Sequence, residues 1–162
     1  MNLKKLFFLT LAVFIVTCSP NTSKAGVLEI RDTDTGKVLG KWQLNEHEEF
    51  AIEFIHSVNK SPVRETFRIE NGTIQLVSAR FYSYGAGIQS DLSEDQILKY
   101  EGDVMIISGY NTSFDKLNII VSDHILFLNN RIIRLQDLSD LSKDKSVKNS
   151  DKRNTHITIQ YR

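Results

Sequence analysis

The sequence predicts one all-β domain, an antiparallel β-sandwich or partly closed barrel of about ten short strands with at most one short helix. Short runs in which apolar and polar residues alternate recur along the chain, and turn residues such as Asn71-Gly72 separate them. No long segment has the apolar spacing of an amphipathic helix. The 162 residues are enough for one domain of ordinary size and not for two.

The first 25 residues have the pattern of a secretory signal. Two lysines precede an apolar run over residues 6–16, which is too short to span a membrane. Ser23-Lys24-Ala25 before Gly26 fits the small-x-small rule for cleavage. We therefore expect an exported protein, periplasmic or extracellular, with a signal at 1–25 and a β domain at 26–162.

A second interpretation of the same segment is a lipid anchor. The sequence Ile15-Val16-Thr17-Cys18 resembles a bacterial lipobox, except that Thr17 stands where glycine, alanine or serine is usual. Lipidation at Cys18 would leave residues 21–25 as a short tether, and this would be the domain's attachment to a membrane. Both alternatives stay open at this point.

Composition excludes several classes of function. Cys18 is the only cysteine, so the domain after the signal has no disulfide, no catalytic thiol and no thiolate metal site. The whole chain has 20 basic and 20 acidic residues. Removing the three lysines of the signal leaves 17 basic against 20 acidic residues, a net charge of −3. This balance gives no electrostatic reason to expect nucleic acid as a partner.

Two strands are expected directly after the signal. Residues 27–31 alternate apolar and polar side chains, and residues 37–44 carry Val38, Leu39, Trp42 and Leu44. The turn-forming residues 32–36 lie between them, so the two strands should form a hairpin.

The next stretch, residues 50–87, contains the clearest strand pattern of the chain. Phe50 to His56 and Val63 to Glu70 both alternate, with Asn59 to Pro62 as a turn between them. Asn71-Gly72 favours a type I′ turn, because this turn needs positive φ at both central residues. A third strand should then begin near Thr73.

These turns predict a register for the three strands. A four-residue turn at 59–62 places His56 opposite Glu65, and pairing of Glu70 with Thr73 places Glu65 opposite Ser78. Arg80 lies two residues further along on the same face. Because the same face also carries Phe, Ile and Leu side chains, the sequence predicts a polar row inside an apolar interior.

A buried carboxylate needs a partner. We expect Glu65 to be matched by His56, Ser78, Arg80 or backbone donors of the following loop. Two interpretations remain for this cluster. It is either a satisfied polar plug at the open end of the sandwich, or the floor of a binding pocket. In the second case the predicted binding residues are His56, Ser57, Glu65, Ser78, Arg80, Tyr84, Gly85 and Gly87, with the glycine loop as a roof.

The rest of the chain is expected to be mostly strand. Residues 91–100 could form one or two helical turns, with Ser93 and Gln96 as a cap. Residues 139–154 are rich in Ser, Lys, Asp and Asn and predict a charged surface loop. Short β-rich runs are expected at 102–107, 117–121, 125–128, 132–135 and 156–161, with Gly109-Tyr110-Asn111 and Asn129-Asn130 among the turns between them.

The sequence favours a protein that is not an enzyme and holds no cofactor. The predicted register puts Glu65 between His56 and Ser78, so these two would lie about 10 Å apart, too far for a serine nucleophile and its base. A metal site on His56 and Glu65 would need a third ligand from His47, Asp123 or His124 at unknown distance. We keep a metal-dependent enzyme only as the weaker alternative.

The sequence also resembles a known family. The residues His56-Ser57-Val58, Pro62-Val63-Arg64-Glu65 and 81–87 (Phe-Tyr-Ser-Tyr-Gly-Ala-Gly) are similar to the pattern of small exported bacterial proteins called domain of unknown function 1850 (DUF1850). The resemblance covers most of the chain after the signal, although the loop at 139–154 is longer than is usual there. Members are often encoded beside TRAP-type transporters of the TAXI class.

The resemblance implies an accessory part in the uptake of small organic anions, with a TRAP transporter or its solute-binding protein as partner. It supplies no catalytic residue. We therefore expect an exported binding module. A structural protein of the cell envelope is the alternative of a different class.

Overall fold

We describe the fold from a computed structural model, in which residues 25–83, 85, 91–140 and 155–162 are described. Residues 1–24 of the predicted signal, with Cys18, the loop residues Tyr84 and Gly87, and most of the charged segment 139–154 lie outside these ranges. Export and lipidation therefore stay predictions. Within the described ranges no helix is both long and apolar enough to cross a membrane.

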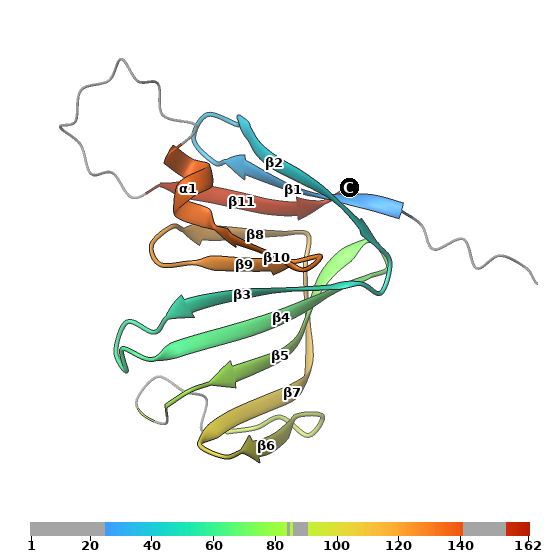
Figure 1. The fold of residues 1–162 in the computed structure, drawn as a ribbon. Helices are drawn as coiled ribbons and strands as arrows, with labels where there is room; N and C mark the ends of the chain where they lie inside the picture. The colour runs from blue at the N-terminus through green and yellow to red at the C-terminus, as the bar shows by residue number, and fades with distance from the viewer. Residues whose placement is uncertain (1–24, 84, 86–90, 141–154) are drawn as a thin grey trace, which may run out of the picture.

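The described residues form eleven strands and one short helix in two antiparallel sheets (Figure 1). The smaller sheet has the order β2-β1-β11-β8, and the larger has the order β10-β9-β3-β4-β5-β7-β6. The fold is thus the predicted all-β sandwich, with sheets that do not close into a barrel. The elements are β1 (Ala25–Asp32), β2 (Val38–Asn45), β3 (Glu49–Ile55), β4 (Pro62–Glu70), β5 (Thr73–Phe81), β6 (Ile97–Glu101), β7 (Val104–Phe114), β8 (Lys116–Ile120), β9 (Ile125–Leu128), β10 (Arg131–Arg134), α1 (Leu135–Asp140) and β11 (His156–Tyr161).

The core lies between the two sheets. Alternate side chains of each strand point inward, so both sheets contribute to a single apolar cluster. Phe50 and Phe67 stack within it at 5.3 Å between ring centroids. Burial of this cluster is the main stabilisation of the fold. Its buried members are Leu28, Ile30, Leu44, Phe50, Ile52, Phe67, Ile69, Ile74, Val121, Leu126, Leu128, Leu135, Ile157 and Ile159.

Both predicted tight turns are present. Asn71 and Gly72 have φ of 52° and 75°, and Asn129 and Asn130 have φ of 49° and 60°. Positive φ at both central residues is the geometry of a type I′ turn, which matches the twist of the strands that it joins. These turns form the β4–β5 and β9–β10 hairpins.

The predicted helix at 91–100 is wrong. Ser93 and Gln96 do contact each other, because the Ser93 amide donates to the Gln96 side chain at 3.0 Å and the Gln96 amide donates to the Ser93 carbonyl at 3.0 Å. These contacts close a turn, and the chain then enters β6 beside β7. The one helix of the described chain is α1, which includes the first two residues of the predicted loop.

The register between β3 and β4 differs from the prediction. Ile52 pairs with Glu65 and Phe54 with Val63, whereas the four-residue turn had placed His56 opposite Glu65. The connection is longer and spans residues 56–61. Two hydrogen bonds of 2.9 Å close it: the His56 amide donates to the Ser61 carbonyl, and the Lys60 amide donates to the His56 carbonyl. The partner of Glu65 thus shifts by four residues, and because this is an even number the apolar side chains still face inward.

A β-bulge changes the pairing of β4 with β5. The pairs Ile69–Ile74 and Phe67–Leu76 follow the prediction, and the register then shifts by one residue, so Glu65 pairs with Ala79 and Thr66 with Ser78. An extra residue in one strand sends every later side chain of that strand to the opposite face. Ser78 and Arg80 therefore do not share the face of Glu65, contrary to the predicted row.

Strand β7 continues through the predicted turn at Gly109-Tyr110-Asn111. Its pairing with β5 also shifts there, and Gly109 has a φ of 79°. A side chain at Gly109 would meet the Asp95 carbonyl oxygen at 2.1 Å, so only glycine fits this bulge. The strand then passes into β8 after one residue, which carries the chain from the larger sheet to the smaller (Figure 1).

The outer face of the smaller sheet holds a covered carboxylate. Glu29 is 2% exposed, and Arg31, Lys41 and Arg162 pair with it. Hydrogen bonds from Arg31, Lys41 and Gln160 lower the pKa of Glu29 to about 2 despite its burial. The cluster ties β1, β2 and the end of β11 together.

Candidate functional site

Two neighbouring cavities lie on the inner side of the larger sheet. The first has a volume of about 280 Å³, is partly open to solvent and lies between β3, β4 and β8. The second has a volume of about 540 Å³ and lies beside the 56–61 turn. Phe54, Glu65 and His124 line both cavities. We call this pair of cavities the inter-sheet cavity.

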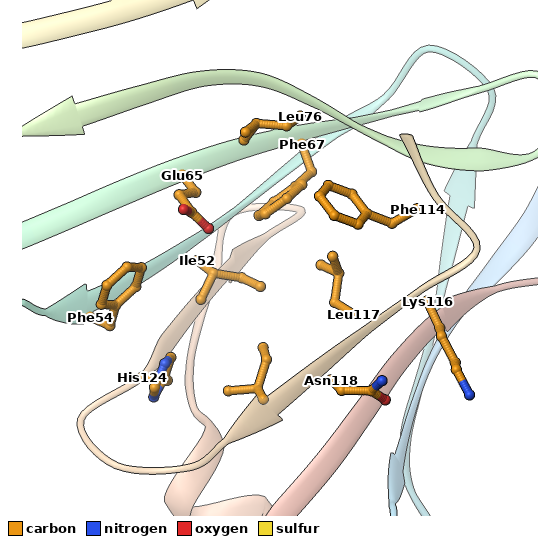
Figure 2. A pocket seen from close by; sticks show the side chains of 11 residues that line it. Ile52, Phe54, Glu65, Phe67, Leu76, Phe114, Lys116, Leu117, Asn118 and His124 are labelled. Atoms are coloured by element: carbon orange, nitrogen blue, oxygen red, sulfur yellow. The ribbon is translucent and has the colours of Figure 1, made fainter. Parts of the chain in front are cut away.

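The walls of the smaller cavity are mainly apolar. Figure 2 shows Phe54, Phe67 and Phe114 around it, with the Glu65 carboxyl directed inward. Such a surface is typical of sites for small molecules, in which a few polar groups orient the ligand. The full lining is Ile52, Phe54, Glu65, Phe67, Leu76, Phe114, Lys116, Leu117, Asn118, Ile119 and His124.

Glu65 is the acidic group of the inter-sheet cavity. Among the described residues Glu65 makes no hydrogen bond or ion pair. In the same part of the chain, every fully buried polar side-chain atom has a hydrogen-bond partner. The carboxyl oxygens therefore reach the open cavity instead of being sealed in the core. Burial among the apolar walls raises the pKa of Glu65, because the charged form loses hydration. Of the partners expected for Glu65, His56, Ser78 and Arg80 do not bond to it, and most of the expected glycine loop lies outside the described residues.

Tyr110 of β7 lines the larger cavity near Glu65. Burial raises the pKa of the Tyr110 hydroxyl, and the negative charge of Glu65 raises it further. The hydroxyl consequently stays protonated at physiological pH and can donate a hydrogen bond into the cavity. The bulge at Gly109 precedes this residue directly.

His124 lies on the opposite wall, in the loop between β8 and β9. Its ring stacks on Phe54 with 5.4 Å between centroids, and its Nδ1 accepts a hydrogen bond from the Ser122 amide at 3.2 Å. Burial lowers the pKa of His124, although the charge of Asp123 acts in the opposite direction. With Nδ1 as acceptor, the neutral ring carries its proton on Nε2.

The structure places only part of the predicted binding set at the inter-sheet cavity. His56, Ser57 and Glu65 line the larger cavity. His56 does not face Glu65 across the sheet, however, because it belongs to the turn and its Nδ1 accepts from the amides of Val58 and Asn59, both at 3.3 Å. This imidazole therefore shapes the rim of the cavity.

The other predicted residues are elsewhere or outside the described ranges. Ser78 and Arg80 lie on the outer face, where Arg80 pairs with Glu101 at 3.2 Å. Gly85 lies against the Asn59 side chain, since a Cβ at Gly85 would meet Asn59 Oδ1 at 2.7 Å. The glycine segment thus begins next to the 56–61 turn. Tyr84 and Gly87 lie outside the described residues.

Sequence reasoning missed Phe54, Tyr110 and His124 as site residues. The sequence suggests His124 only as a third metal ligand and predicts a turn at Tyr110. The alternation of β3 already pointed Phe54 inward, so this residue could have been found. Tyr110 and His124 reach the neighbourhood of Glu65 through the bulge in β7 and through the return of the chain to β9. No local sequence pattern predicts either feature.

A metal site has little support in the geometry. Within the described ranges, no three His, Asp or Glu side chains gather closely enough to hold a metal ion. Glu65 and His124 border the same cavity, and the third ligand that a protein site needs is not beside them. The polar groups of the cavity include the Glu65 carboxyl, the neutral His124 imidazole and the Tyr110 phenol, which are suited to binding a ligand.

Fold and site together define a small β-sandwich whose mainly apolar cavity is lined by a single carboxyl, that of Glu65. The model of the family described as domain of unknown function (DUF1850) matches residues 50–135, more than half of the chain. The chain belongs to this family. The matched residues include all those that line the inter-sheet cavity. No curated protein matches the chain, and no solved structure matches it.

Proposed function

We propose that this protein is an exported binding module, and that the inter-sheet cavity is its ligand site. We propose further that it acts with a TRAP-type transporter of the TAXI class, or with the solute-binding protein of that transporter, in the uptake of small organic anions. The partner and the transported class come from the family resemblance. The cavity supports the binding role.

One observation carries the proposal. Among the described residues Glu65 has no partner, and it projects into a partly open, apolar cavity, although an ionised group in such a place loses hydration. A side chain kept only for packing would be satisfied by other groups of the protein. A carboxyl that is free toward a cavity is instead available to a ligand, as is the Tyr110 hydroxyl beside it.

An enzymatic role has weaker support. Ser122 and His124 adjoin, but Ser122 Oγ lies 3.4 Å from Nδ1, and the same nitrogen already accepts from the Ser122 amide. A serine nucleophile needs a short hydrogen bond to a base that is free to take its proton. Binding without chemistry therefore describes these residues better.

The binding half of the proposal can be tested with a neutral apolar probe. Benzyl alcohol titrated into the isotope-labelled protein should shift the amide signals of β3, β4 and the 122–124 loop. Leu117→Trp, which fills the cavity, should abolish these shifts. Ile120→Trp is the matched control, because Ile120 lies in the same strand and is 57% exposed. Shifts that are scattered over the surface, or that survive Leu117→Trp, would refute a site in the cavity.

The partner half needs the full chain in its own cells. Cross-linking followed by purification should yield a TRAP-type membrane subunit or its solute-binding protein, identified by mass spectrometry. The covalent link should map near the cavity or the 56–61 turn. Recovery of the full chain without either protein would count against the association and leave the cavity result unaffected.

A further inference from the structure

The charges around Glu65 decide which ligand the cavity accepts. The two arginines of β4, Arg64 and Arg68, lie on the outer face and are already paired there. Arg64 pairs with Glu53 at 2.8 Å, and Arg68 pairs with Glu49 at 2.6 Å. The pleat of the strand thus separates the negative charge of Glu65 from the nearest positive charges in the sequence.

The groups that face Glu65 from the neighbouring elements add no positive charge close to it. Tyr110 and His124 are neutral for the reasons given above, and His56 directs Nδ1 at the backbone of its own turn. Lys116 belongs to the lining, but Figure 2 shows it at the other end of the cavity with its side chain directed away from Glu65. Among the described residues, ionised Glu65 therefore has no compensating positive charge.

The walls beside this charge are aromatic. Phe54, Phe67 and Phe114 line the smaller cavity, and Phe81 and Tyr110 line the larger. The faces of aromatic rings attract cations and do not attract anions. A carboxylate surrounded by such rings is the combination that recognises an organic ammonium group, whereas it repels a ligand carboxylate.

We propose that the inter-sheet cavity binds a small organic cation, an amine or quaternary ammonium on an apolar body, with its charge against Glu65 and its apolar part among the phenylalanine rings. This inference rests on the proposed role of the cavity as a ligand site and names the ligand class. It concerns the ligand of this module and not the anion that a partner transporter would carry.

The test compares ligands of one shape and different charge. Benzylammonium, benzyltrimethylammonium, benzyl alcohol and benzoate are titrated separately by calorimetry into the wild-type protein. Both ammonium compounds should bind about tenfold more tightly than benzyl alcohol, the expected effect of one charge-specific contact in a desolvated site. Benzoate should bind most weakly.

Two variants assign the preference to Glu65. Glu65→Gln keeps the shape of the side chain and removes its charge, so the ammonium-to-alcohol ratio should fall to about one. Glu53→Gln removes a carboxylate from the outer face of the adjacent strand and should leave the ratio unchanged. In the wild type, ammonium affinity should rise with pH through the pKa of Glu65, while benzyl alcohol affinity stays constant.

The outcomes separate this inference from the proposal on which it rests. Equal binding of benzyl alcohol and the ammonium compounds would refute the cation preference and leave the cavity as a ligand site. Tighter binding of benzoate would also refute it. If none of the four compounds perturbs the residues of the cavity, both the preference and the site are wrong.

Discussion

Removing the charge of Glu65 should stabilise the protein. Glu65 is half-buried and has no partner among the described residues, so its ionised form loses hydration without compensation. An unsatisfied buried polar group lowers the free energy of unfolding by about 1–3 kcal/mol. Because the cavity is open to solvent, we place Glu65 at the lower end of this range. We expect Glu65→Gln to raise the free energy of unfolding by about 1 kcal/mol near neutral pH.

The pH dependence of this gain has a definite sign. Because the folded-state pKa of Glu65 is raised above its value of 4.5 in the unfolded chain, the native protein takes up the proton first as pH falls. Stability from Glu65 is therefore fully present below 4.5 and is lost as pH rises through the folded pKa. The difference between wild type and Glu65→Gln should be largest at about pH 8 and small at about pH 4.5.

Urea unfolding followed by circular dichroism at several pH values measures this difference. Glu53→Gln serves as the control, because it removes an outer-face carboxylate that pairs with Arg64. The control should not become more stable as pH rises. A Glu65→Gln protein that is less stable than wild type at neutral pH would show that Glu65 has a strong partner, and the account of the cavity would fail.

Two further predictions concern the frame around the site. Glu29→Gln should destabilise the protein by about 2 kcal/mol at neutral pH, less than the full effect of a pKa lowered from 4.5 to about 2, because Lys41 is 57% exposed and solvent screens it. That contribution is present above pH 4.5 and is lost as pH falls toward 2. Urea unfolding of both proteins at neutral pH and at low pH checks it, and equal unfolding midpoints at neutral pH would contradict it. Gly72→Ala should cost about 1 kcal/mol through backbone strain alone, since φ is 75° and a Cβ there meets nothing within 4 Å. Thermal unfolding measures this cost, and a loss several times larger would mean that the β4–β5 hairpin has changed its turn.

The local pattern predicted the strands well. Alternation located β3, β4 and β5 to within one or two residues, and the asparagine-containing turns appeared where both central residues need positive φ. The prediction failed at 91–100, where Ser93 and Gln96 suit a helix cap and a tight turn equally. A contact between residues three apart does not say which of these the chain adopts, and the pairing of β6 with β7 decided it.

Of the predicted binding residues, His56, Ser57 and Glu65 line the larger cavity, but the predicted row of facing polar side chains is not formed. Turn length and bulges set the register, and both the six-residue turn at 56–61 and the bulge after Leu76 lack a strong local signal. Each one-residue shift of the register places a side chain on the opposite face of the sheet. For this reason Ser78 and Arg80 left the predicted row while Glu65 stayed in it.

By itself the sequence determined the all-β class, the main turns, the membership in the DUF1850 family and the inward position of Glu65, because each depends on residues that are near one another in the chain. Only the tertiary structure decided that Tyr110 and His124 share a cavity with Glu65. These residues come from three separate strands and loops of the chain. Their meeting depends on a bulge in β7 and on the passage of β7 into β8, which no single stretch of sequence encodes.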